Sequence, residues 1–231
     1  KCLQVLQKIC GAKRVLPSTY EISGRLSLSS STPIFGAFCN VHTGFLGPQE
    51  VGIKRSRITP TTDHRPVEQA LCEEAVVWKH LSHPNIVPFK GVTFRPLQLV
   101  SEWIPCGEIK EYIKENPQAN LLDLLLGIAK GLNYLHSRNI IHGDLKGANI
   151  VVDTTGNAQI LDFSLASITL DSQSLASTTD QRNATVRFTP PEILKGLANY
   201  SKASDVFAFG MFVIEVGGNQ NTLVQNKLTC S

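Results

Sequence analysis

The loop sequence HGDLKGANIVVD spans residues 142–153 and carries an acid, an ammonium and an amide within six positions. Asp144 and Asn149 are five positions apart, with Lys146 between them, and the apolar run Ile150–Val152 follows directly. We expect a loop held between rigid elements, a usual place for catalytic groups. Asp144 could accept a proton from a hydroxyl, and the amide oxygen of Asn149 could bind a metal ion.

Regular elements are predicted on both sides of this loop. The apolar residues before it step by four and three, which predicts an amphipathic helix with Leu121, Leu125, Ile128, Leu132 and Leu135 on its inner face. Two short strands, 150–152 and 158–161, follow and are joined by the turn DTTGN. Asp162 comes directly after the second strand and offers another hard oxygen ligand suited to Mg²⁺.

The N-terminal half is predicted to be rich in β-structure. Residues 1–16 are typical of a short helix with Leu3, Leu6 and Ile9 on one face, closed by Pro17. Short strands follow up to residue 58, among them a hairpin over 44–58 whose second strand holds Val51, Ile53 and Lys54. Further strands are predicted near 86–89 and 97–103.

A helix is predicted from Pro66 to Leu81, and it carries a carboxylate on its apolar face. The inner positions are Val67, Ala70, Leu71, Val77, Trp78 and Leu81. Glu74 falls within that stripe, whereas Glu73 is turned away from it by about 100°. A buried carboxylate needs a cation, so we expect this helix to have a buried cationic partner, which Lys54 could supply.

The order of these motifs resembles that of protein kinase domains over nearly the whole chain. The motifs are VGIK (51–54), Glu74, HGDLKGAN (142–149), DFS (162–164), TPPE (189–192) and SDVFAFG (204–210). Each motif alone is weak evidence, but together and in this order they are strong. The segments EEAVVWKHLSHPNIVPFKGV and LVSEWIPCGEIKEYI resemble the tyrosine-kinase-like group of serine/threonine kinases, particularly kinases abundant in mushroom-forming fungi.

The resemblance implies an α+β, two-lobed fold. A helical extension would occupy residues 1–20, a β-rich ATP-binding lobe with one long helix residues 21–104, and a mainly helical catalytic lobe residues 105–231. The final apolar helix, 205–216, must be covered on all sides, and the polar segment after Val216 lacks an apolar stripe. We therefore expect a lobe truncated after about residue 216, with an exposed apolar patch beside this helix.

The resemblance also assigns roles to single residues, for a kinase that uses ATP and Mg²⁺ to phosphorylate Ser and Thr hydroxyls of proteins. Lys54 would contact the phosphates and pair with Glu74, and Asn149 and Asp162 would hold Mg²⁺. Asp144 would be the catalytic base, and Lys146 would steady the phosphoryl group. The remaining nucleotide-side residues would be Ile34, Gly36, Val41, Glu102 and Ile104, while Thr185 would pack near Asp144.

Several positions depart from the family pattern. The glycine loop, aligned on Val41, retains only Gly36, so the grip on phosphate would be weakened. Ser164 replaces a glycine after Asp-Phe and restricts the backbone there. Gly143 replaces an arginine that binds a phosphorylated loop residue in many members, so control through that contact is not expected.

Composition excludes several other classes. The net charge of +3 makes no case for nucleic acid or membrane binding, and no apolar run approaches the ~20 residues of a membrane span. The six cysteines show no metal-ligand spacing, as in reduced, cytoplasmic proteins. Taken singly, Glu74, Asp162, Asn149 and a packed His142 could each be structural. The rivals to an active kinase are a nucleotide-binding pseudokinase or scaffold and an inactive fragment.

Overall fold

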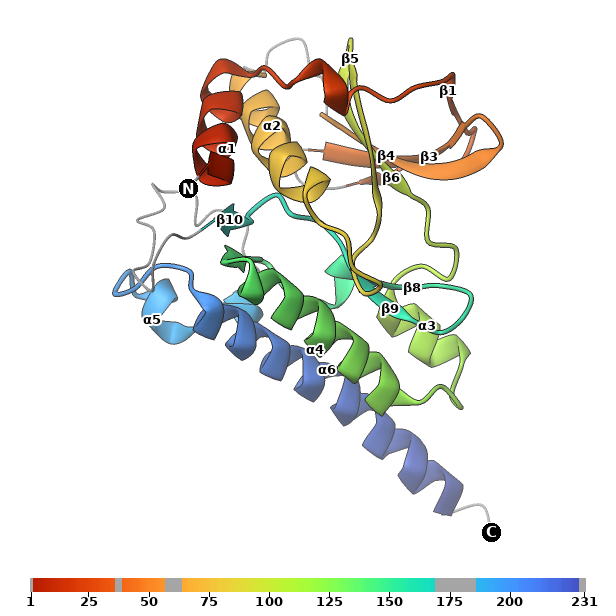
Figure 1. Cartoon of the computed structure of the whole chain (residues 1–231). Helices are drawn as coiled ribbons and strands as arrows, with labels where there is room; N and C mark the ends of the chain where they lie inside the picture. The colour runs from red at the N-terminus through yellow and green to blue at the C-terminus, as the bar shows by residue number, and fades with distance from the viewer. Residues whose placement is uncertain (1, 36–38, 57–63, 169–185, 229–231) are drawn as a thin grey trace. The chain divides into compact units, whose positions relative to one another are not determined.

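The structure is a computed structural model that describes residues 2–35, 39–56, 64–168 and 186–228. The chain divides into two compact units, which are described separately (Figure 1). The first unit comprises Lys1–Pro105 and Asp162–Ile168, and the second comprises Cys106–Leu161 and Thr169–Ser231. One unit is built on an antiparallel sheet and the other mainly on helices, so the predicted α+β, kinase-like fold class is confirmed.

The sheet of the first unit runs in the order β1-β3-β4-β6-β5, with β2 paired to β3. Its strands are β1 (Leu26–Leu28), β2 (Ile34–Phe35), β3 (Cys39–Leu46), β4 (Gln49–Ser56), β5 (Phe89–Phe94) and β6 (Leu97–Glu102). The predicted hairpin is β3–β4, and its turn uses Gly47 at a φ of +61°, a conformation that favours glycine. Val51, Ile53 and Val100 form a fully buried cluster within the unit.

The strand predicted at 86–89 was misplaced, because β5 begins only at Phe89. Ile86 and Val87 are buried, yet they lie in the connection before the strand. Pro84 and Pro88 flank these residues and cannot donate ladder hydrogen bonds. The Val87 carbonyl instead accepts a hydrogen bond from Nε1 of Trp78 at 2.8 Å. Ile86 forms only an isolated bridge and no ladder, so the apolar run mainly reflects core burial.

Two helices and a short strand complete the first unit: α1 (Cys2–Lys13), α2 (Arg65–Lys79) and β10 (Ser167–Ile168). The predicted inner stripe of α2 is confirmed at Leu71, Glu74, Val77 and Trp78, which are all buried. The residues between them, Cys72, Ala75 and Val76, are buried as well. Helix α1 packs along α2, beside it in Figure 1, and covers this second face.

The second unit contains α3 (Ile109–Glu115), α4 (Leu121–Ser137), α5 (Pro191–Leu194) and α6 (Lys202–Leu228), with strands β7 (Ile140–Ile141), β8 (Ile150–Val152) and β9 (Ala158–Ile160). The side chain of Asn120 caps α4 by accepting from the Leu122 N–H at 3.1 Å. Three of the predicted inner residues, Ile128, Leu132 and Leu135, are buried. Figure 1 shows α4 and α6 running side by side in opposite directions.

Helix α6 is longer than the sequence pattern predicted. It continues through Gly217 and Gly218 to Leu228, where the expectation was an end near Val216. Glycine lowers helix propensity by only about 1 kcal/mol, and no proline stops the helix before Leu228. Phe212 and Val216 are buried. Val206, Phe207 and Ile214 are exposed, which confirms the apolar surface expected on this helix.

Candidate active site

The ammonium group of Lys54 lies among two carboxylates in the first unit. Its Nζ donates to both oxygens of Glu74 at 2.9 Å and to Oδ1 of Asp162 at 2.7 Å. Lys54 comes from the C-terminal half of β4, Glu74 from the buried face of α2, and Asp162 from the segment after β9. The predicted approach of Lys54 to Glu74 is confirmed.

Burial and charge oppose each other in this network. Burial disfavours the charged form of Lys54, but the carboxylates of Asp162 and Glu74 outweigh it and hold its pKa above the usual value. For Glu74, burial raises the pKa to about 7, although the Lys54 ammonium favours the ionised form. The network therefore keeps a permanent cation beside a carboxylate that titrates near neutral pH.

Asp162 is held in an unusual backbone conformation. Its φ is +65°, a left-handed value that is rare for residues other than glycine and is concentrated at functional sites. The Ser164 N–H donates to Oδ1 of Asp162 at 3.3 Å. Phe163 is fully buried, and its ring lies 5.6 Å from that of Trp78 on α2. The segment after Asp162 is thus tied to the helix that carries Glu74.

The nucleotide-side residues Ile34, Val41 and Lys54 form a row across neighbouring strands. Ile34 pairs with Val41 between β2 and β3, and Val41 pairs with Lys54 between β3 and β4. Gly36, the remaining glycine of that loop, lies outside the described residues. The row thus places two apolar side chains beside a cation on one face of the sheet.

The end of β6 supplies the backbone groups expected to meet adenine. The Glu102 N–H already donates to the Pro88 carbonyl at 2.9 Å. The Glu102 carbonyl accepts from the Ser101 hydroxyl at 3.2 Å and has a second lone pair that could accept from a base. The Glu102 carboxylate is used elsewhere, in an ion pair with Lys90 at 3.0 Å. Ile104, two residues on, is buried.

In the second unit, the predicted catalytic residues lie together. Nζ of Lys146 is 2.7 Å from Oδ2 of Asp144. The amide nitrogen of Asn149 donates to the Asp144 carbonyl at 2.8 Å and to its Oδ2 at 3.2 Å. One oxygen of Asp144 therefore accepts from two side chains, which fixes the carboxylate in place. The amide oxygen of Asn149 is the atom that could bind a cation.

The residue that holds this loop is Asp205 at the start of α6, which was not among the predicted site residues. Its carboxylate is 1% exposed and accepts from the N–H groups of His142 and Gly143, both at 2.9 Å. Nε2 of His136 on α4 lies 2.8 Å from the same carboxylate. An acid directly before an apolar helix, in SDVFAFG, was the signal available, because a buried carboxylate requires donors.

Gly143 and His142 are both explained by local geometry. Gly143 has a φ of +80°, which glycine adopts without strain. His142 is fully buried, in agreement with its interpretation as a packed histidine, and its Nδ1 accepts from the Asp144 N–H at 3.2 Å. His142 and Gly143 thus shape the backbone that presents Asp144.

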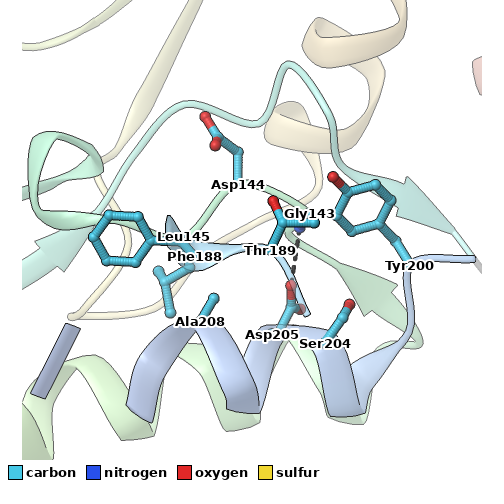
Figure 2. A pocket seen from close by; sticks show the side chains of 9 residues that line it. All are labelled: Gly143, Asp144, Leu145, Phe188, Thr189, Tyr200, Ser204, Asp205 and Ala208. Carbon is cyan, nitrogen blue, oxygen red and sulfur yellow. Dashed lines mark hydrogen bonds between the residues drawn. The ribbon is translucent and has the colours of Figure 1, made fainter. Parts of the chain in front are cut away.

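A small cavity adjoins Asp144 in the second unit. It measures about 10 Å³, room for roughly one water molecule, and its lining includes Asp144, Thr189, Tyr200 and Asp205. Figure 2 shows Thr189 and Tyr200 beside the Asp144 loop, with the Gly143–Asp205 bond below. Burial raises the pKa of Tyr200, and its hydroxyl shares a hydrogen bond with Thr189. Thr185, expected near Asp144, lies outside the described residues.

Each unit contains a hard oxygen atom of the kind that Mg²⁺ prefers as a ligand. Asp162 offers a carboxylate in the first unit and Asn149 an amide oxygen in the second, both hard ligands. Within the ranges that the structure describes, no three His, Cys, Asp or Glu side chains are grouped as a metal cluster would require. Among the same residues, no helix has the length and apolar character needed to cross a membrane.

Comparison with known proteins agrees with this geometry. A family model described as protein tyrosine and serine/threonine kinase matches residues 35–227. A probable serine/threonine-protein kinase of Dictyostelium discoideum is 33% identical over 190 residues, covering 78% of this chain and 11% of the relative. The serine/threonine-protein kinase STY46 of Arabidopsis thaliana is 28% identical over 187 residues, 78% of this chain and 31% of the relative.

Tyrosine kinases are similar to the chain as well. The tyrosine-protein kinase Btk of Drosophila melanogaster is 32% identical over 157 residues, covering 64% of this chain and 20% of the relative. The chain thus spans between 11% and 31% of the length of these three relatives. On the match of residues 35–227, the chain belongs to the protein tyrosine and serine/threonine kinase family.

Proposed function

We propose that the chain transfers the γ-phosphoryl group of ATP to Ser and Thr hydroxyls of proteins, with Mg²⁺ as the cofactor. The observation that carries this proposal is the position of the Lys54 ammonium, 2.9 Å from Glu74 and 2.7 Å from Asp162. A lysine fixed in this way is a preorganised cation for phosphate oxygens. The proposal uses both groups of residues, those around Lys54 and those around Asp144.

The nucleotide-side residues bind and orient ATP. Glu74 holds Lys54 from behind, so that the ammonium can contact the α- and β-phosphates. Ile34 and Val41 cover the base, and the backbone of Glu102 and Ile104 contacts the adenine edge. Asp162 and Asn149 supply oxygen ligands to Mg²⁺, which when bound neutralises charge on the phosphates.

The acceptor-side residues handle the proton. The hydroxyl oxygen of the substrate forms a bond to the γ-phosphorus while the bond to the β-phosphate oxygen breaks, and ADP leaves. The hydroxyl proton passes to Asp144, which Lys146 and Asn149 hold in place. Lys146 also offsets negative charge on the phosphoryl group during transfer.

The choice of Ser and Thr as acceptors rests on Lys146. Lys146 stands two positions after Asp144, and the resemblance to serine/threonine kinases implies that a lysine there favours Ser and Thr acceptors. The named relatives include kinases of both acceptor classes, so the acceptor needs a direct measurement.

A transfer assay with radiolabelled ATP and a mixed protein substrate tests the proposal. Asp144→Asn is expected to reduce transfer by at least ~100-fold, in line with the loss of a general base, and Lys54→Met to weaken ATP binding and transfer together. Arg55→Met, one residue along β4 and on the other side of the sheet, is the matched control for Lys54. Transfer that survives in Asp144→Asn, or phosphotyrosine as the main product, would contradict the proposal.

A second candidate is nucleotide binding without turnover, because the glycine loop retains only Gly36 of its three expected glycines. A thermal-shift titration separates the two candidates. ATP with Mg²⁺ that stabilises the wild type but not Asp162→Ala, together with no transfer to any substrate, would favour the binding protein over the enzyme.

A further inference from the structure

Helix α1 buries an unusual set of residues in the first unit. Its buried residues are Gln4, Gln7, Cys10 and Gly11. Its aliphatic residues Val5 and Ile9 are 53% and 55% exposed. Hydrophobic burial alone would produce the reverse orientation, with the glutamines outside. The orientation of α1 is therefore set by specific contacts of its polar face.

The first of these contacts reaches the segment after Asp162. Nε2 of Gln7, a residue only 7% exposed, donates to the Ala166 carbonyl at 3.1 Å. The Ala166 N–H in turn donates to the Phe163 carbonyl at 3.0 Å and closes a turn. Gln7 thus holds the turn that begins next to Asp162.

The second contact is with α2, one residue before Glu74. Gly11 lies so close to Glu73 that a Cβ at this position would be 2.5 Å from Cγ of Glu73 and 2.7 Å from its Cδ. The Glu73 carboxylate is held in turn by Nε2 of Gln69 at 2.9 Å. A side chain at position 11 would therefore have to displace the Glu73 side chain from its present position.

The chain that follows α1 is also anchored within the first unit. At its C-terminal end, Arg14 forms an ion pair with Glu68 of α2 at 3.7 Å. Farther along, the Ile22 N–H donates to the Val92 carbonyl of β5 at 3.0 Å. The helix is therefore tied to the sheet, to α2 and to the turn after Asp162.

We propose that α1 is an intramolecular clamp, in which Gln7 and Gly11 are positioning residues that keep Glu74 and Asp162 on Lys54. The effect of the clamp on activity rests on the proposed kinase function. Gln7 acts through Ala166 on Asp162, and Gly11 acts through Glu73 on α2. Unseating α1 would loosen two of the three members of the network while leaving the sheet that carries Lys54 intact.

Substitutions in the full chain test the clamp at Gln7. Gln7→Leu keeps the size of the side chain and removes the donor. Gln4→Leu is the matched control, because Gln4 is 8% exposed on the same helix and its replacement removes no bond to the turn. Two measurements need no nucleotide: hydrogen exchange of residues 162–168, and labelling of Lys54 by an amine reagent, which attacks only the neutral amine.

We expect Gln7→Leu to speed exchange of this segment by roughly two- to tenfold, the range for one buried hydrogen bond. Lys54 labelling should rise as well, while Gln4→Leu matches the wild type in both measurements. If both variants change exchange and labelling equally, α1 only adds stability and the clamp is overturned. A wild-type rate of Lys54 labelling in Gln7→Leu would also overturn the clamp.

A second pair of variants tests Gly11. Gly11→Ala should raise Lys54 labelling because the new Cβ displaces Glu73. Adding Glu73→Ala removes every atom that the Cβ would meet at the closest approaches, so the double variant should return to the wild-type rate. Failure of this rescue would overturn the role of Gly11.

Nucleotide binding connects the clamp to the proposed function. Mg²⁺ should raise the affinity of the wild type for ATP, and this increase should be a few-fold smaller in Gln7→Leu. In Gln4→Leu the increase should equal that of the wild type. If Gln7→Leu keeps the full Mg²⁺ gain, the clamp does not tune the site and the proposal fails. If the wild type binds no ATP, the proposed function fails, and the exchange and labelling results decide the clamp alone.

Discussion

Replacing Asp205 with alanine is expected to lower the free energy of unfolding of the second unit by about 3–5 kcal/mol. The carboxylate accepts from two buried backbone N–H groups at 2.9 Å and contacts His136 at 2.8 Å. Each buried donor left without an acceptor costs roughly 1–3 kcal/mol. The two donors dominate the sum, which is large beside the ~5–15 kcal/mol that stabilises a typical domain.

Urea unfolding followed by circular dichroism measures this loss, and amide exchange at His142 and Gly143 locates it. Asp205→Asn keeps one acceptor oxygen and should lose about half as much. His136→Gln leaves both backbone bonds in place and should cost about 1 kcal/mol or less, which makes it the matched control. If Asp205→Ala unfolds within about 0.5 kcal/mol of the wild type, a typical surface effect, the carboxylate does not hold the loop.

The other predictions concern the network, the loop and α6. Because the pKa of Glu74 is raised to about 7 from 4.5, the folded chain keeps a proton that the unfolded chain releases between these values. Stability should therefore fall as pH rises from about 4.5 to 7, on the order of 3 kcal/mol at most, and Glu74→Gln should flatten this slope in urea titrations at several pH values. Gly143→Ala should cost roughly 1–2 kcal/mol in the same assay, because φ there is +80°. Gly210→Ala, within α6 and with open space at its Cβ, is the control and should not destabilise. Ile214→Glu should leave the unfolding midpoint unchanged but reduce light scattering on heating, because Ile214 is 63% exposed; a large drop in the midpoint would mean that Ile214 is covered.

Some of the site could be predicted because its physical requirements are visible in sequence. Glu74 falls on an apolar helical stripe and therefore needs a cation, and the VGIK motif with its family resemblance identified that cation as Lys54. Asp144, Lys146 and Asn149 are close in sequence within one short loop, so their proximity followed from spacing. Both predictions depended on local patterns.

Other features depend on contacts between distant segments and leave a weaker local signal. Asp205 meets its partners 62 and 63 positions away in the chain, and nothing in its own neighbourhood identifies them. For α1, the apolar stripe of Leu3, Leu6 and Ile9 suggested an inward face, but the buried face carries Gln4 and Gln7. Polar contacts such as the one between Gln7 and Ala166, 159 positions apart, outweighed hydrophobicity there.

The first unit is assembled from two separate stretches of chain, so it cannot be expressed as one continuous fragment without losing part of it. A cloning boundary placed after Pro105 would yield Lys54 and Glu74 but omit the Asp162–Ile168 segment. Such a fragment would carry Lys54 with one carboxylate instead of two, and it would uncover the Trp78 face on which Phe163 packs. To express the first unit alone, residues 162–168 would have to be fused to residues 1–105 through a linker. Shortened versions of the chain that fail to bind nucleotide would therefore say nothing about the nucleotide site itself.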